Sequence, residues 1–194
     1  MPRHRVYLVA GLGNPGCEYA LTRHNAGFMV LEALAEKFGI EITRSKFDVL
    51  FGRGRIAGVE VILAKPQTYM NRGGPPIRRL ADYFRIQCEA LVVIHDDIDL
   101  AYERLKIKVK GGDGGHKGIR SLINAFGGDQ FARLRVGVGR SQVGADVSNH
   151  VLTAFSRDEL AAWDRILQTA TEAVVTILSE GTKASMNQYN KIPR

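Results

Sequence analysis

Short apolar runs alternate along the chain with stretches in which apolar residues recur every three or four positions. Apolar, β-branched runs of this length are typical of buried strands, and they cover residues 6–11, 91–95 and 134–138. After the first run, the spacing of apolar residues predicts an amphipathic helix from about Asn25, ended by Gly39. The chain is therefore expected to begin as a strand followed by a helix.

The rest of the chain continues this alternation. Ala57 and Gly58 separate two strand-like segments, residues 47–56 and 59–64, which predicts an antiparallel hairpin. We further expect helices over 76–84 and 118–126, a strand over 105–109, and a long closing helix that starts at a capping box of Ser156 and Glu159. This order predicts an α/β fold, a single-domain three-layer sandwich with a twisted mixed β-sheet flanked by helices. From about residue 183 we expect a basic surface tail.

Composition narrows the class of protein. The chain has 194 residues, of which 45% are hydrophobic, so one core and a single domain over residues 1–194 are expected. A net charge of +7 favours a polyanionic partner such as nucleic acid, although a basic protein without such a partner has the same balance. Cys17 and Cys88 have neither metal-site nor disulfide spacing, which favours a cytoplasmic protein. No apolar run is long enough for a signal-peptide core or a membrane span.

The sequence GLGNPG at residues 11–16 matches the glycine pattern of a dinucleotide-binding loop. Such a site also needs a helix directly after the loop and an acidic residue at the end of the next strand. Here residues 17–24 lack helical periodicity, and the acids at the expected distance, Glu32 and Glu36, fall inside the predicted helix. The dinucleotide interpretation therefore fails. The turn instead places Asn14 at the carboxyl end of a strand, where open α/β sheets carry their sites.

Two further residues could form an acid–base pair. His24, in TRHNAG, precedes the predicted helix, whose dipole disfavours a protonated imidazole and so suits a general base. Asp96, in HDDIDL, follows a strand, and a carboxylate there could orient an imidazole and stabilise its protonated form. Both residues could instead be helix or turn caps. The three acids Asp96, Asp97 and Asp99 could also bind a divalent metal together with His95, but their spacing matches no common metal-binding motif.

GGDGGHKG at residues 111–118 is a glycine-rich loop before a helix, without the Gly-Lys-Ser/Thr order of a P-loop. Its glycines could let His116 and Lys117 close over a substrate, or the loop could be a mobile surface segment. Near it in the sequence lie the basic residues Lys106, Lys108, Lys110, Arg120, Arg133 and Arg135. The three lysines at alternate positions share one face of the predicted strand, which fits either a phosphate-binding stripe or a solvated face.

Four motifs, in this order and at these intervals, resemble those of the bacterial peptidyl-tRNA hydrolase family: GLGNPGCEYALTRHNAGF, KPQTYMN, HDDIDL and GGDGGHKG. The resemblance covers nearly the whole chain and includes RLRVGVGR at 133–140. It implies hydrolysis of the ester between a peptide's C-terminal carbonyl and the 3′-terminal ribose of tRNA, with no cofactor and no metal. It also implies a cytoplasmic monomer whose partner is peptidyl-tRNA.

The resemblance assigns roles to particular residues. His24 would be the general base that activates water, and Asp96 would orient it. Lys108 and Arg135 would hold the 5′-phosphate of tRNA. Lys117 departs from the family's usual GGHNG, and because lysine cannot accept a hydrogen bond, we hypothesise that it contacts an RNA phosphate or the ribose end. The residues expected to bind the substrate or its transition state are Asn14, Tyr19, Tyr69, Asn71, His116 and Lys117.

Three classes of protein remain open on the sequence alone. The four motifs favour a metal-free esterase that acts on peptidyl-tRNA. The alternative is a non-catalytic RNA-binding relative of the same fold, but RNA binding alone would not require an imidazole, a carboxylate and two amides in these motifs. The third class is a metal-dependent hydrolase that uses His95, Asp96 and Asp99, and it predicts inhibition by a chelator.

Overall fold

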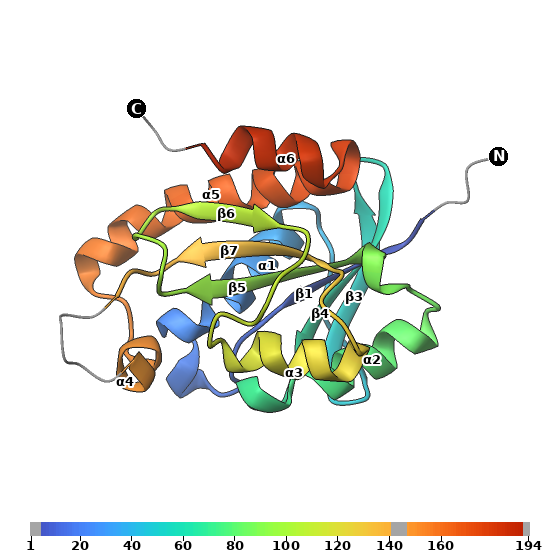
Figure 1. Cartoon of the computed structure of the whole chain (residues 1–194), viewed down its shortest axis with the longest axis horizontal. Coiled ribbons are helices and arrows are strands. Elements are labelled where there is room, and N and C mark those ends of the chain that lie inside the picture. Colours follow the sequence, from blue (N-terminus) through green and yellow to red (C-terminus); the bar gives the residue numbers. More distant parts are fainter. Residues whose placement is uncertain (1–4, 141–146, 192–194) are drawn as a thin grey trace.

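The computed structural model describes residues 5–140 and 147–191, and it shows strands and helices alternating along the chain (Figure 1). The strands are β1 (Tyr7–Gly11), β2 (Arg44–Lys46), β3 (Val49–Ile56), β4 (Val59–Pro66), β5 (Leu91–Asp97), β6 (Leu105–Lys108) and β7 (Ala132–Gly137). The α-helices are α1 (Ala26–Lys37), α2 (Gly74–Tyr83), α3 (Lys117–Phe126), α4 (Val147–Leu152), α5 (Arg157–Glu180) and α6 (Thr182–Tyr189). Between them lie the 3₁₀ helices η1 (Cys17–Tyr19), η2 (Arg23–Asn25), η3 (Met70–Arg72) and η4 (Cys88–Ala90).

The strands form one mixed sheet in the order β2-β3-β4-β1-β5-β7-β6. β1 pairs in parallel with β4 and β5, and β5 pairs in parallel with β7. β2–β3, β3–β4 and β6–β7 are antiparallel pairs. The predicted mixed sheet is therefore confirmed. The carboxyl ends of its parallel strands meet at one edge, which is where open α/β sheets bind ligands.

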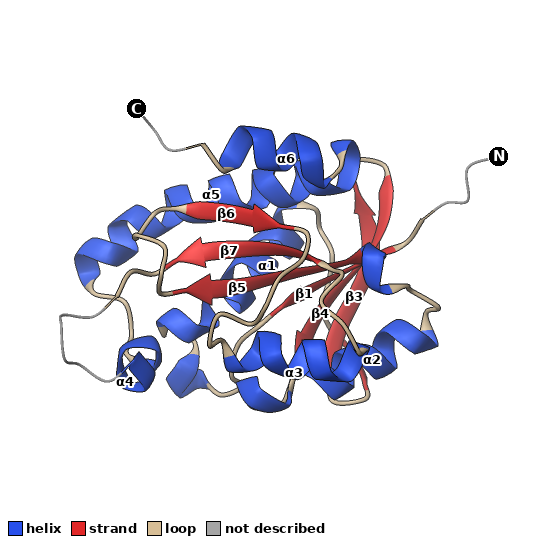
Figure 2. Ribbon diagram, in the orientation of Figure 1, coloured by secondary structure: helices blue, strands red, loops and turns tan. Residues whose placement is uncertain are grey.

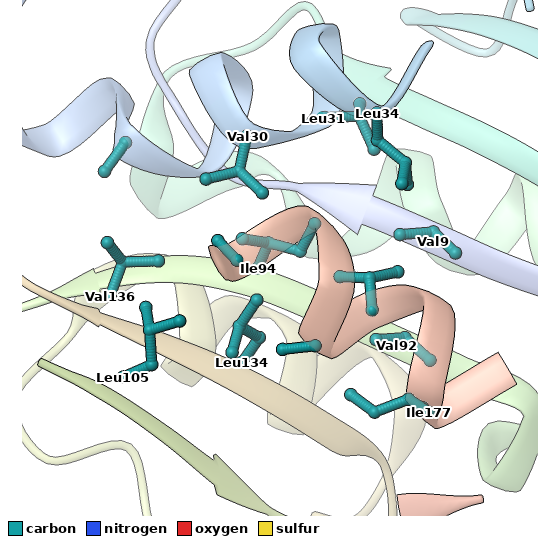
Figure 3. Packing of buried hydrophobic residues seen from close by; sticks show 14 of the residues in the cluster. Val9, Val30, Leu31, Leu34, Val92, Ile94, Leu105, Leu134, Val136 and Ile177 are labelled. Atoms are coloured by element: carbon teal, nitrogen blue, oxygen red, sulfur yellow. The ribbon is translucent and has the colours of Figure 1, made fainter. Parts of the chain in front are cut away.

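Helices cover both faces of the sheet and give the predicted three layers (Figure 2). On one face, Leu31 and Leu34 of α1 and Ile177 of α5 join Val9 and Ile94 of the sheet in one buried cluster (Figure 3). On the other face, α2 and α3 cover a second buried cluster. Burial of each such side chain contributes about 1.5–3 kcal/mol, so the two clusters fix the order of the layers. Within the described residues, no helix has the length and apolar character needed to cross a bilayer.

Most of the predicted elements form close to their expected bounds. The hairpin of β3 and β4 turns at Ala57 and Gly58, as predicted. The capping box is also present, because the Ser156 side chain accepts from the backbone N–H of Glu159 and the Glu159 side chain accepts from that of Ser156. The strand expected over 105–109 is one residue shorter, since β6 ends at Lys108.

The expected basic tail from about residue 183 is wrong for residues 183–189, which lie in α6. This helix packs against α5 and β6, and Ser185 within it is fully buried. Met186 and Tyr189 of α6 pack against the core cluster that contains α1 and α5. Two apolar side chains among polar neighbours give too weak a periodicity to predict a helix. The neighbouring layers stabilise it instead.

Candidate active site

A pocket of about 660 Å³ opens at the carboxyl edge of the sheet, and every site residue predicted from the sequence lines it. These residues come from the loop after β1, from η1, η2 and η3, from the end of β5, from β6 and β7, and from the start of α3. The pocket also takes in residues that were not predicted to bind the substrate, among them Ile98, Val151 and Leu152. The structure adds how the groups are oriented and which of their atoms are already bonded.

Asp96 lies at the centre of the pocket between two imidazoles. Its carboxylate is 2% exposed, and its Oδ1 and Oδ2 lie 2.9 and 3.0 Å from Nδ1 of His24. Oδ1 also lies 2.9 Å from Nε2 of His116. Because Nδ1 of His24 faces the carboxylate, its Nε2 is the nitrogen left to bind water or substrate. His24 is therefore oriented by Asp96, and neither residue serves as a helix cap.

His116 has a single tautomer that fits its partners. Its Nδ1 accepts the backbone N–H groups of Gly118 and Ile119 at 3.1 and 3.2 Å, which makes the side chain the N-cap of α3. An accepting Nδ1 leaves the proton on Nε2, which donates it to Asp96. Both nitrogens of His116 are therefore used inside the protein. Three hydrogen bonds hold His116 here, and a closure over a substrate that moved it would have to break them, so the expected closure stays a prediction.

The charge of Asp96 is stabilised by its neighbours. Burial by itself would raise the pKa of this carboxyl group, but the attraction of His24 and His116 and their hydrogen bonds hold it well below its usual range. Asp96 is therefore an anion at neutral pH. His95, on the same strand, is also buried, and burial together with the nearby His116 lowers its pKa well below the ordinary value, so it is neutral.

Asn14 is fixed as a hydrogen-bond donor. Its Oδ1 accepts the backbone N–H of Met70 at 2.8 Å, which fixes the orientation of the amide and leaves the Nδ2 N–H groups as the donors that can bind a ligand. The Asn14 backbone is held in turn by Asn25, which accepts its N–H at 2.8 Å and donates to its carbonyl at 3.0 Å. An amide donor is thus held rigidly beside His24, the residue that precedes Asn25 in the chain.

The remaining predicted substrate residues lie around the mouth of the pocket. Tyr19 is half-buried at the end of η1, while Asn71 in η3 is exposed. Tyr69 is 60% exposed and directly precedes η3. Lys117 is exposed at the first position of α3. A cation at a helix N-terminus is unfavourable by about 0.3–1 kcal/mol, so the fold itself gains nothing from a lysine there.

The basic residues of the RLR segment have different surroundings. Arg135 forms an ion pair with Asp97 beside the pocket. Arg133 is 3% exposed, and its guanidinium donates to the carbonyl oxygens of Gly111 and Gly112, which anchors the glycine-rich loop. The guanidinium of Arg133 therefore holds the loop and is not assigned to a phosphate.

The lysine stripe is shorter than predicted. Lys106 and Lys108 are exposed on β6, and Lys108 lines the pocket. Lys110 lies beyond the end of the strand, so the alternation that would align it with the other two is lost. The cationic face next to the pocket is therefore built from Lys108 and Arg135, with Lys117 across the glycine-rich loop.

The structure does not bring the predicted metal set together. Nδ1 of His95 bonds to the backbone oxygen of Asp96, and Asp99 pairs with Arg140. A different set, His24, Asp96 and His116, has ligand atoms within 4.8 Å of one another. A metal on Nε2 of His116 would move the proton to Nδ1, against two backbone N–H groups. This geometry disfavours a metal at that set.

Sequence reasoning missed the residues that hold the catalytic turn in place. Arg23, next to His24, is buried and binds both carboxylate oxygens of Glu159 at 2.7 Å. Gly27, in the first turn of α1, lies so close to β5 that a Cβ there would be 2.3 Å from the carbonyl oxygen of Ile94. The motif TRHNAG contained both residues, but a single sequence does not show which partners they meet.

The fold and the pocket together define a class of protein, an α/β enzyme in which a carboxylate-oriented imidazole can activate water beside amide and cationic groups. The peptidyl-tRNA hydrolase family matches residues 8–194. The chain is 44% identical to the peptidyl-tRNA hydrolase of Carboxydothermus hydrogenoformans, over 96% of this chain and 99% of that protein. A crystal structure of peptidyl-tRNA hydrolase from Acinetobacter baumannii has a TM-score of 0.89 and 40% identity, covering 96% of this chain and 95% of that one. The chain belongs to the peptidyl-tRNA hydrolase family and is a hydrolase.

Proposed function

We propose that this enzyme hydrolyses the ester that joins a peptide to the 3′-terminal ribose of tRNA, with His24 as the general base. The observation that carries the proposal is the bonding of Asp96, which holds Nδ1 of His24 while the hydrogen bonds of His116 fix the position of the carboxylate. Because Nδ1 faces Asp96, Nε2 is the ring nitrogen of His24 that can take a proton at the pocket, as a general base requires.

The reaction can be followed through these groups. Nε2 of His24 takes a proton from water as the water oxygen attacks the ester carbonyl, and the buried Asp96 anion stabilises the imidazolium that forms. The negative charge then develops on the former carbonyl oxygen, where the Nδ2 amides of Asn14 and Asn71 can donate to it. The imidazolium returns its proton to the ribose 3′-oxygen as the ester bond breaks. The products are the free peptide acid and tRNA.

The cationic groups beside the pocket suit the nucleic-acid part of the substrate. Lys108 and Arg135 offer N–H donors on β6 and β7, and we assign the 5′-phosphate of tRNA to them. Arg135 already pairs with Asp97 through its Nε, so its terminal nitrogens are the ones left for a phosphate. Tyr19 and Tyr69 offer aromatic faces near the pocket for the substrate's terminal residue or base.

The substrate also bears on where and in what form the enzyme acts. Peptidyl-tRNA arises during translation, so we propose that the enzyme works in the cytoplasm. We also propose that it works as a monomer, because residues from one chain supply every group used in the mechanism above. Sedimentation equilibrium at micromolar concentration would test the monomer.

The function is tested with an N-acetylated aminoacyl-tRNA in the presence of excess EDTA. We expect the wild-type protein to release free tRNA and to lose no activity to the chelator, while His24→Ala and His24→Asn lose about 10²–10⁴-fold in kcat. Thermal unfolding of the variants within a few degrees of the wild type would show that they are folded. Absence of cleavage by folded wild-type protein would favour the non-catalytic RNA-binding alternative, and inhibition by EDTA would favour the metal-dependent one.

A further inference from the structure

The end of helix α6 is bonded to the strand that carries Lys108. Among the strands that the structure describes, β6 is at the edge of the sheet and pairs with β7 alone. On its other side, Asn190 accepts the Ile107 N–H at 2.7 Å through Oδ1 and donates to the Ile107 carbonyl at 2.9 Å through Nδ2. One side-chain amide thus satisfies both backbone groups that an edge strand leaves open at this position.

Other contacts make α6 a rigid support for this link. The Ser185 hydroxyl, fully buried, donates to the carbonyl oxygen of Ala173 in α5 at 3.0 Å. Just before β6, Nη2 of Arg104 donates to the carbonyl oxygen of Lys191 at 3.1 Å. The segment that the sequence predicted to be a surface tail is therefore attached both to α5 and to the edge strand.

Ile107, the residue that Asn190 holds, lies between two exposed lysines. The strand alternates so that Leu105 and Ile107 are buried while Lys106 and Lys108 face outward. β6 has four residues, and a short edge strand with one ladder of hydrogen bonds opens locally at low cost. Bonds on its second side would oppose that opening. They would keep the Cα of Lys108 fixed beside the pocket.

We propose that Asn190 is a positioning residue for tRNA binding, which acts by holding β6 so that Lys108 meets a phosphate of the substrate. The proposal rests on the phosphate-binding role of Lys108 proposed above. A fixed backbone reduces the conformational entropy that Lys108 loses when it binds, so Asn190 contributes to affinity without touching RNA. It makes no contact with the reacting ester, so the chemical step is unaffected.

The test compares Asn190→Ala with Lys108→Ala, the double variant, and Asn187→Ala. Asn187 is an exposed asparagine of the same helix and serves as the matched control. KM and kcat for N-acetylated aminoacyl-tRNA are measured from about 50 to 200 mM salt, and each phosphate contact contributes roughly 0.7–0.9 to the slope of log affinity against log salt. We expect Lys108→Ala to lose one such contribution and Asn190→Ala to lose a measurable part of it. In both variants KM rises at low salt and kcat is unchanged.

The double variant distinguishes positioning from general destabilisation. If Asn190 acts through Lys108, adding Asn190→Ala to Lys108→Ala changes neither KM nor the salt slope further. Hydrogen exchange gives an independent readout, because the Ile107 amide should lose protection in Asn190→Ala and keep it in Asn187→Ala.

Two results overturn the inference. In the first, Asn190→Ala keeps the wild-type salt slope although Lys108→Ala flattens it. In the second, the effects of the two substitutions on KM and on the salt slope add up in the double variant. If Lys108→Ala itself leaves KM and the slope unchanged, the proposed phosphate role of Lys108 fails instead, and the inference falls with it.

Discussion

Replacing Asp96 by asparagine should convert His24 from an acceptor into a donor at the pocket. His116 must donate from Nε2, because its Nδ1 accepts two backbone N–H groups. The carbonyl oxygen of an asparagine at 96 would therefore turn toward His116. Its amide nitrogen would then take the place of Oδ2, 3.0 Å from Nδ1 of His24, while its oxygen, in the place of Oδ1, would stay 2.9 Å from the same nitrogen. The amide donor opposes a proton on Nδ1 and so shifts His24 toward the tautomer with the proton on Nε2, even though the oxygen shared with His116 still accepts weakly, and a protonated Nε2 is no base for water.

The magnitude follows from the interactions lost. A hydrogen bond to a charged group contributes about 1.5–3 kcal/mol, so loss of the carboxylate opposite the imidazolium costs roughly 10- to 150-fold in rate. The unfavourable tautomer adds to this loss, and the total should lie within about 10²–10⁴-fold in kcat, the usual range for general-base catalysis. KM should change little, because the carboxylate is 2% exposed and binds only side chains of the protein.

The assay is single-turnover hydrolysis of N-acetylated aminoacyl-tRNA by saturating enzyme. Asp99→Asn is the matched control, because Asp99 is an exposed carboxylate three residues further along that pairs with Arg140. The double variant Asp96→Asn with His116→Ala gives the sharper test. Without His116, the asparagine can turn its carbonyl oxygen to Nδ1 of His24, so part of the lost rate should return. A double variant slower than Asp96→Asn alone would refute the tautomer argument.

Other changes test other parts of the structure. Lys117→Asn should raise KM for tRNA substrates and flatten its salt dependence, and unchanged values would remove Lys117 from the RNA contacts. Gly27→Ala should cost about 1–3 kcal/mol of stability and lower kcat by displacing η2, because the new Cβ would lie 2.3 Å from the Ile94 carbonyl oxygen. Thermal unfolding measures the loss of stability, with Gly73→Ala as the control, because the nearest contact of a Cβ at Gly73 is 3.7 Å. Burial raises the pKa of Asp96, but its two histidine partners lower it more, so the pKa is lower in the folded than in the unfolded protein. The ionised Asp96 therefore contributes its full stabilisation above the unfolded pKa of about 3.9, and this stabilisation is lost as pH falls toward the folded pKa. The difference in unfolding free energy between wild type and Asp96→Asn should therefore shrink below about pH 4, and a constant difference down to pH 3 would contradict this.

The fold class could be predicted because its signals are local. Apolar runs and the Ala57-Gly58 turn indicate strands and a hairpin, and the Ser156–Glu159 capping box marks a helix start. α6 could not be predicted in the same way, because its stability comes from packing on α5 and β6. Its polar sequence hides this contact.

Many of the residues that line the pocket could also be predicted, since they stand in motifs next to the end of a strand or the start of a helix. Their individual bonding could not. Arg133 and Arg135 are two residues apart on one strand, yet the first holds loop carbonyls and the second pairs with Asp97. His116 was expected to move with a flexible loop, and it is instead bonded at both nitrogens. Which partner each group meets depends on residues far away in the chain.

The amino-acid sequence alone indicated the α/β class, most of the strands and helices, and many of the groups that line the pocket, but not β2, α4 or α6. The folded chain settles how those groups are bonded: Asp96 contacts two histidines, the Oδ1 of Asn14 is bonded to Met70, and Asn190 holds the strand of Lys108. This division follows from the range of the forces involved. Periodicity and turn preference act between near neighbours in sequence, whereas a hydrogen bond or ion pair is set by distances of about 3 Å between segments that only folding brings together.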